Sequence, residues 1–275
     1  MVKRTHTSEV INEIVAGWAV SLLMAAGPGL APSAAAADVD YVALGDSYSS
    51  GVGTVDASGS CGRSPSGYPS LWAADHPLAV FHFDACGGAT TEDVRASQLS
   101  NLTGDTDLVS ITIGGNDAGF SPTLAVCTAG TDDACAAQVA SARATIAEVL
   151  PGDLDATYRA IRQGAPEATV VVLGYPHLFD PAASCPGGGL SVAKRQVLND
   201  AADDLTQVIA DRAQAAGFTF VDVRPAFAGH EICTAAPWIN GVSQEIPSGS
   251  YHPNADGYAQ GYLPLLTEAA AGIGA

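Results

Sequence analysis

The sequence predicts an α/β protein in which helices cover both faces of a mainly parallel, five-stranded sheet. Short apolar segments alternate along the chain with longer helical ones, which is typical of a parallel sheet buried on both faces. Three of these segments end at glycine-containing turns. Hydrophobic residues make up 47% of the chain and charged residues 15%, a balance that indicates a large core rather than disorder. We therefore expect one three-layer α/β/α domain over residues 38–275.

The first half of that domain contains three expected strands and two expected helices. Residues 39–44 are β-rich and end at a glycine, and residues 68–75 have a helical pattern. Residues 80–83 form a short strand that ends near a Cys-Gly-Gly turn. Residues 91–97 form a short helix, with a threonine at its start as the cap. Residues 108–113 are an apolar run stopped by two glycines, as expected of a buried strand.

The second half continues the alternation. Residues 134–163 are alanine-rich and helical, with a break expected at the Pro-Gly pair 151–152. Residues 169–173 (TVVVL) form the clearest core strand. A long amphipathic helix over 191–216, a fifth strand over 218–223 and a last helix over 255–271 complete the prediction.

Residues 1–37 differ from the rest and predict a secretory signal peptide. Lys3 and Arg4 precede an apolar run over 14–26, and small residues then offer an A-x-A cleavage pattern that ends at Ala37. The alternative is an uncleaved membrane anchor. The apolar run is too short, and too soon broken by a Gly-Pro pair, for stable insertion in a bilayer. We therefore expect a secreted, extracellular protein that is a monomer.

The formal net charge of −18 argues against a nucleic-acid partner, because no basic stripe is present to displace counterions from phosphates. All six cysteines follow the expected leader. An even number in an exported chain predicts three disulfides rather than a metal site, for which no CxxC or HxxxH spacing exists. The shortest loops give the pairs Cys61–Cys86, Cys127–Cys135 and Cys185–Cys233.

Four segments fall at the edge formed by the carboxyl ends of the expected strands, where open α/β sheets hold their ligands. They are GDSYSSG with Ser47, CGGATT with Gly88, GGND with Asn116, and the loop with His252 before the last helix. Ser47 is a candidate nucleophile, His252 a candidate general base, and the N–H groups of Ser47, Gly88 and Asn116 candidate oxyanion donors. Each has a structural alternative: a helix cap, a surface histidine, a tight turn or an Asx turn.

These four residues, in this order, resemble the defining motifs of the SGNH/GDSL hydrolase superfamily. The resemblance extends over residues 42–262 and is greatest to its secreted bacterial lipase/esterase branch with three disulfides. It implies a flavodoxin-like sheet and a serine ester hydrolase that acts on acyl-ester or lipid substrates through an acyl-enzyme intermediate. Ser47 would be the nucleophile, His252 the base, and the N–H groups of Ser47, Gly88 and Asn116 the oxyanion hole. No metal or organic cofactor is implied.

The chain departs from this pattern at one position. Most of the superfamily has Asp three residues before the histidine, where Gly249 stands here. Asp256 and Asp222 are possible substitutes, although Asp256 or the nearby Asn254 is better explained as the cap of the last helix. A main-chain carbonyl also suffices to accept Nδ1–H, and the carbonyl of Gly249 is our choice. We therefore expect a Ser–His dyad.

Several alternatives remain open. A phospholipase, a thioesterase or a carbohydrate O-deacetylase would use the same residues, and a secreted binding module could have kept the fold without catalysis. An α/β-hydrolase is disfavoured, because GDSYS lacks the closing glycine of GxSxG. We expect Asp46 and Asp117 to hold their turns. Tyr48 and Trp238 line an acyl pocket or pack in the core.

Overall fold

The computed structural model describes residues 39–185, 189–243 and 247–273. The expected signal peptide, residues 1–37, lies outside this described part. Within it, no helix is both long and apolar enough to cross a membrane.

The predicted fold class is confirmed. All neighbouring strands pair in parallel, in the order β2-β1-β3-β4-β5. This is the flavodoxin-like order. The strand order changes direction between β1 and β3, and such a switch point is where open α/β sheets bind ligands. The strands are β1 (Asp40–Gly45), β2 (Val80–Phe83), β3 (Leu108–Thr112), β4 (Thr169–Leu173) and β5 (Thr219–Val221).

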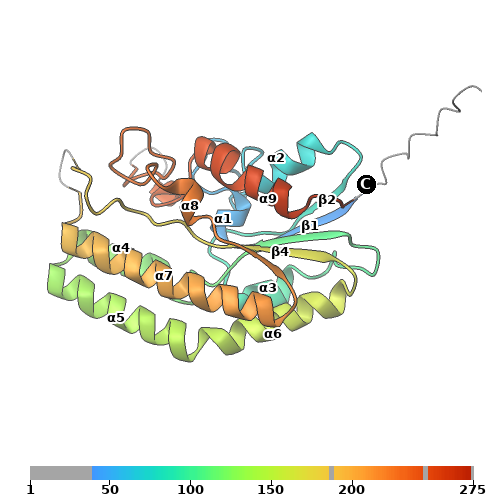
Figure 1. Ribbon diagram of the computed structural model, residues 1–275, viewed down its shortest axis with the longest axis horizontal. Coiled ribbons are helices and arrows are strands. Elements are labelled where there is room, and N and C mark those ends of the chain that lie inside the picture. Colours follow the sequence, from blue (N-terminus) through green and yellow to red (C-terminus); the bar gives the residue numbers. More distant parts are fainter. Residues whose placement is uncertain (1–38, 186–188, 244–246, 274–275) are drawn as a thin grey trace, which may run out of the picture. The chain divides into compact units, whose positions relative to one another are not determined.

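Helices cover both faces of this sheet (Figure 1). One face carries α2 (Tyr68–Asp75), the π-helical turn η2 (Gly257–Tyr262) and α9 (Leu263–Ala269). The other carries α3 (Thr91–Ser97), α5 (Asp132–Glu148), α6 (Leu150–Gly164) and α7 (Val192–Ala215). The remaining helical segments are α1 (Ser47–Ser50), α4 (Phe120–Ala129), α8 (Arg224–Phe227) and the 3-10 turn η1 (Pro247–Gly249).

The core follows from the apolar strands. Every residue of β3 is buried, and so are the last five of β1 and the last four of β4. Strands covered on both faces need no polar alternation, which is why these segments are runs of Val, Ile and Leu. Because the three central strands are fixed in this core, the turns that leave their carboxyl ends have rigid starting points.

Several bounds differ from the predictions, and the fifth strand, expected over 218–223, spans only Thr219–Val221. The break in the long helical segment falls at Val149, before Pro151, because proline fits the first turn of a new helix, where its missing N–H is not needed. Helix α4 was not predicted. The last helix begins with the π-helical turn η2.

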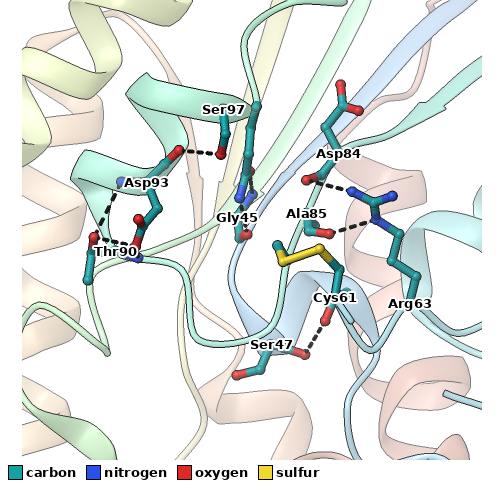
Figure 2. Close-up of a disulfide and its surroundings, with 12 residues drawn as sticks. Gly45, Ser47, Cys61, Arg63, Asp84, Ala85, Thr90, Asp93 and Ser97 are labelled. Carbon is teal, nitrogen blue, oxygen red and sulfur yellow. Dashed lines mark hydrogen bonds between the residues drawn. A yellow bond between two sulfur atoms is a disulfide. The ribbon is translucent and has the colours of Figure 1, made fainter. Parts of the chain in front are cut away.

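The three predicted disulfide pairs are confirmed. Cys61–Cys86 joins the loop after α1 to the turn after β2 (Figure 2). Arg63 lies beside it and donates to the carbonyls of Ala85 (2.9 Å) and Asp84 (3.2 Å). The N–H of Gly87 donates to the Cys61 carbonyl at 2.8 Å. The turn that carries Gly88 is therefore held by one covalent bond and several hydrogen bonds.

Candidate active site

Ser47 is the first residue of α1 and is separated from the end of β1 by Asp46 alone. Asp46 caps this short helix, since its Oδ1 accepts the N–H of Tyr48 at 2.9 Å. The Asp46 N–H donates to the Thr112 carbonyl (3.0 Å), which fixes the turn against β3. The N–H of a first helical residue is not used inside the helix, so that of Ser47 is available to an oxygen approaching its side chain. The structural role expected for Asp46 is thus confirmed.

His252 lies against Ser47, although 205 positions separate the two residues in sequence. Its Nε2 is 2.7 Å from the Ser47 Oγ, and its Nδ1 is 2.9 Å from the Ser250 carbonyl oxygen. A carbonyl oxygen can only accept, so Nδ1 carries the proton. Nε2 is then the unprotonated nitrogen and accepts from the serine hydroxyl, as a general base must.

The prediction that the Gly249 carbonyl orients the ring is wrong. That carbonyl accepts the main-chain N–H of His252 (3.2 Å) and the side-chain Nδ2 of Asn240 (3.2 Å). It is turned toward these donors, and the carbonyl of the next residue, Ser250, takes the imidazole instead.

The two candidate carboxylates have other partners. Asp222 forms an ion pair with Arg224 (2.7 Å), and Asp256 accepts from Gln260 (2.9 Å). Asn254, rather than Asp256, is the residue that caps the last helical segment, because its Oδ1 accepts the Gly257 N–H at 3.0 Å. In the described part of the chain, no carboxylate is hydrogen-bonded to His252.

Burial determines the protonation state of His252. The residue is 8% exposed, and this desolvation lowers the pKa of its imidazole to about 4, although the Ser250 carbonyl acts in the opposite direction. The ring lies near two aromatic side chains, Tyr48 (centroids 5.1 Å apart) and Phe120 (6.0 Å). At neutral pH the imidazole is therefore uncharged, the state that can accept a proton.

Gly88 and Asn116 lie on two turns that Asp117 joins. The Asp117 carboxylate accepts the N–H of Thr91 (3.1 Å) and its hydroxyl (2.6 Å), so it holds its turn as predicted. Asn116 lies with Ser47 in one narrow cleft, and its Nδ2 donates one hydrogen to the Ala89 carbonyl (2.9 Å). The second amide hydrogen is left for a ligand.

Gly88 has a backbone φ of +80°, a value that residues other than glycine rarely adopt. Among the described residues its N–H has no hydrogen-bond partner. The Asn116 amide thus shares the cleft with Ser47, and Gly88 precedes the Ala89 whose carbonyl accepts from Asn116.

Sequence reasoning missed Tyr175, which follows β4. Its hydroxyl donates to Asp46 Oδ2 (2.5 Å) and accepts the Gly115 N–H (3.0 Å). Burial raises the pKa of Asp46 to about 7, against the hydrogen bonds from Tyr175 and Tyr48. From the loop after β4, this tyrosine thus ties the turn of Ser47 to the neighbouring turn of Asn116. A tyrosine outside any motif gives no sequence signal for such a role.

A cavity of about 80 Å³ adjoins the cleft. Cavity and cleft share Tyr48, Gly115, Phe120 and Tyr175, and the rest of the cavity is lined mainly by apolar residues of α4, α5 and α7. Tyr48 is therefore where the sequence analysis placed it, both buried and on a pocket wall. Trp238 does not line this cavity and packs on Phe227 and His230 against the core, which was the second alternative for it.

The chain is similar to known proteins over most of its length. The model of the GDSL-like Lipase/Acylhydrolase family matches residues 43–260. A lipase of Streptomyces rimosus is 53% identical over 84% of this chain and 86% of its own. Lipase 1 of Streptomyces coelicolor is 48% identical over 92% of this chain and 97% of its own.

Two solved structures share the fold at high identity. The extracellular lipase of Streptomyces rimosus superposes with a TM-score of 0.82 at 52% identity, over 84% of this chain and 99% of that one. Phospholipase A1 of Streptomyces albidoflavus gives 0.81 at 45% identity, over the same shares. The family match and these relatives establish that the chain belongs to the GDSL-like lipase/acylhydrolase family and is an ester hydrolase.

Proposed function

We propose that this protein is a secreted lipase or carboxylesterase that cleaves acyl esters through a Ser47–His252 dyad. The observation that carries the proposal is the 2.7 Å contact between Ser47 Oγ and the unprotonated Nε2 of His252, with Nδ1 held by the Ser250 carbonyl. A hydroxyl in contact with a neutral, oriented imidazole is the activated nucleophile of serine hydrolases.

In the first step, the Ser47 Oγ attacks the ester carbonyl carbon while its proton passes to His252 Nε2. The carbonyl π electrons move to the oxygen, and the N–H groups of Ser47 and Gly88 and the Asn116 amide stabilise that negative charge. When the carbonyl re-forms, the bond to the alcohol oxygen breaks, and the proton on Nε2 passes to this leaving group. The products are the free alcohol and an acyl-enzyme.

In the second step, water replaces the alcohol. His252 Nε2 takes a proton from water as the water oxygen attacks the acyl carbon. The second tetrahedral intermediate expels Ser47 Oγ, which recovers its proton from Nε2, and the carboxylic acid leaves. The base is neutral before and after each step, in keeping with the low pKa of its imidazole.

The apolar cavity beside the cleft suits the acyl chain of the substrate. It begins at Tyr48 and Phe120 and extends between α5 and α7, with Ala142 and Ala201 in its wall. No lysine or arginine is among the residues that line the cavity or the cleft. Together with the net charge of −18, this lining favours uncharged acyl esters over anionic lipids.

A phospholipase A1 activity is the second candidate, because a protein of that name is 45% identical to this chain. The same dyad would cleave the acyl ester of a glycerophospholipid. The charge argument predicts that hydrolysis of anionic glycerophospholipids is slower than that of uncharged esters.

Hydrolysis of p-nitrophenyl esters tests the proposal, with Ser47→Ala and His252→Ala as variants. We expect kcat/KM to fall by about 10³ or more in each variant. Undiminished hydrolysis by Ser47→Ala would refute it. A tributyrin assay run beside phosphatidylcholine and phosphatidic acid vesicles separates the two candidates.

Secretion is supported by the basic and apolar pattern of residues 1–37, by three disulfides and by the extracellular relative. N-terminal sequencing of protein recovered from the culture medium should begin at Asp38.

A further inference from the structure

His252 occupies a β-bulge between two neighbouring segments. The N–H of Tyr251 donates to the Asn240 carbonyl (2.9 Å), and the N–H of Asn240 donates to the His252 carbonyl (2.9 Å). Ile239 and Pro253 form an antiparallel bridge next to these bonds. Two residues, Tyr251 and His252, therefore lie opposite the single residue Asn240. This is the hydrogen-bond pattern of a G1 bulge, a feature that re-aims side chains next to active sites.

The first residue of such a bulge has left-handed φ and is usually glycine. Here it is Tyr251, with φ +65°. Its hydroxyl hydrogen-bonds Thr128 Oγ1 (2.7 Å), and its carbonyl accepts the Tyr48 hydroxyl (2.6 Å). A strained conformation of this kind persists only where the surroundings determine it. The bulge that carries the base is therefore anchored from several sides.

The side chain of Asn240 adds contacts to two other segments. Its Nδ2 donates to the Gly53 carbonyl (2.8 Å) in the loop after α1 and to the Gly249 carbonyl (3.2 Å) at the end of η1. The loop after α1 also lies very close to the segment of His252. A Cβ added to Gly53 would lie only 2.2 Å from the Pro253 carbonyl oxygen. One half-buried amide thus joins three segments around His252.

We propose that Asn240 is a positioning residue for the general base His252, an inference that rests on the function proposed above. Its main chain forms the bulge opposite Tyr251 and His252. Its side chain fixes the Gly249 carbonyl, and because successive peptide planes are linked at one Cα, this restricts the direction of the Ser250 carbonyl. That carbonyl orients the imidazole in place of a carboxylate. The missing aspartate is thereby compensated by an amide that never touches the ring.

The variant Asn240→Asp tests this role, since it keeps the shape and replaces the donating NH₂ with an oxygen that faces two carbonyls. With p-nitrophenyl butyrate, we expect kcat to fall by about 10- to 100-fold and KM to stay within about twofold, because a misplaced base affects chemistry more than binding. Inactivation by an alkyl fluorophosphonate should slow by a similar factor. Asn240→Ala, which removes the donor without adding charge, should show the same split.

Asn254→Asp is the matched control. The Asn254 Nδ2 also joins two segments, through the Pro237 carbonyl (2.9 Å), while its Oδ1 accepts the Gly257 N–H that an aspartate would still accept. This variant should keep near wild-type kcat at a similar Tm. Equal kcat in Asn240→Asp and Asn254→Asp would overturn the proposal. Failure of both Asn240 variants to fold would also overturn it, because the role would then be structural. If Ser47→Ala stays active, the proposed function fails, whatever the result at Asn240.

Discussion

The carbonyl oxygen of Ser250 lies 2.9 Å from His252 Nδ1, the position that a carboxylate holds in a Ser-His-Asp triad. A carbonyl fixes the tautomer as well as a carboxylate does, but it offers only a partial charge to the imidazolium that forms during the reaction. Burial lowers the pKa of His252, and the partial charge of the Ser250 carbonyl, which raises this pKa, only partly offsets that desolvation.

We predict that Asp222→Asn and Asp256→Asn each reduce kcat less than about threefold, because both carboxylates have partners away from the base. Loss of a triad carboxylate costs about 10⁴. Steady-state kinetics on p-nitrophenyl butyrate, with His252→Ala as the reference for a lost base, measures the difference. A drop near 10⁴ in either folded variant would identify a third catalytic residue and contradict the dyad.

The pH dependence of kcat/KM should show an acid limb at about pH 4. Activity requires neutral His252, whose pKa is lowered to about 4 by burial, so activity should persist as pH falls through 6 and 5 and be lost below 4. Asp46 also titrates, because burial raises its pKa to about 7. The control variant Asp46→Asn removes this second titration and should leave the acid limb of His252 in place. Circular dichroism at each pH, with assays after return to pH 7, excludes unfolding as the cause. A limb near 6.5 would mean that the base is solvated.

The strands could be predicted because short apolar runs rich in β-branched residues alternate with longer helical segments. Strands β2 and β4 and helix α3 have the predicted bounds, and the Ser47, Gly88, Asn116 and His252 turns meet at one edge because parallel strands share a direction. Helix α4 was missed because FSPTLAVCTA, between two glycines, contains proline and threonine, which favour helices weakly.

The orienting carbonyl could not be predicted for a different reason. Which carbonyl faces Nδ1 depends on the φ of +65° at Tyr251, and residue preferences alone argue against that value for a tyrosine. The Tyr175–Asp46 hydrogen bond spans 129 positions and belongs to no local pattern. Both features arise from tertiary contacts, which override local preference.

Removal of the Cys61–Cys86 disulfide should affect activity as well as stability. The bond closes a loop over 25 positions, so Cys61→Ser/Cys86→Ser should lower the free energy of unfolding by about 3 kcal/mol. It also braces the turn of Gly88, so we expect about a tenfold loss in kcat at 25 °C.

Cys127→Ser/Cys135→Ser is the control for this disulfide, since its bond closes 8 positions between α4 and α5. It should cost slightly less stability and leave kcat within about twofold. Denaturant unfolding and initial rates give both quantities. Equal kcat in the two double variants would show that the Gly88 turn does not depend on its disulfide.

Filling the apolar cavity should shorten the acyl chains that the enzyme accepts. Ala142 is buried in the cavity wall, and Ala142→Leu adds three carbons there. If the cavity holds the acyl chain, about two methylenes lose their place, and at about 0.8 kcal/mol each the decanoate-to-butyrate ratio of kcat/KM should fall about tenfold. Ala140→Leu, on the exposed side of α5, is the matched control and should leave the ratio unchanged.

A general loss of activity at every chain length would indicate overpacking of the core. An unaltered ratio in a folded Ala142→Leu would place the acyl chain elsewhere.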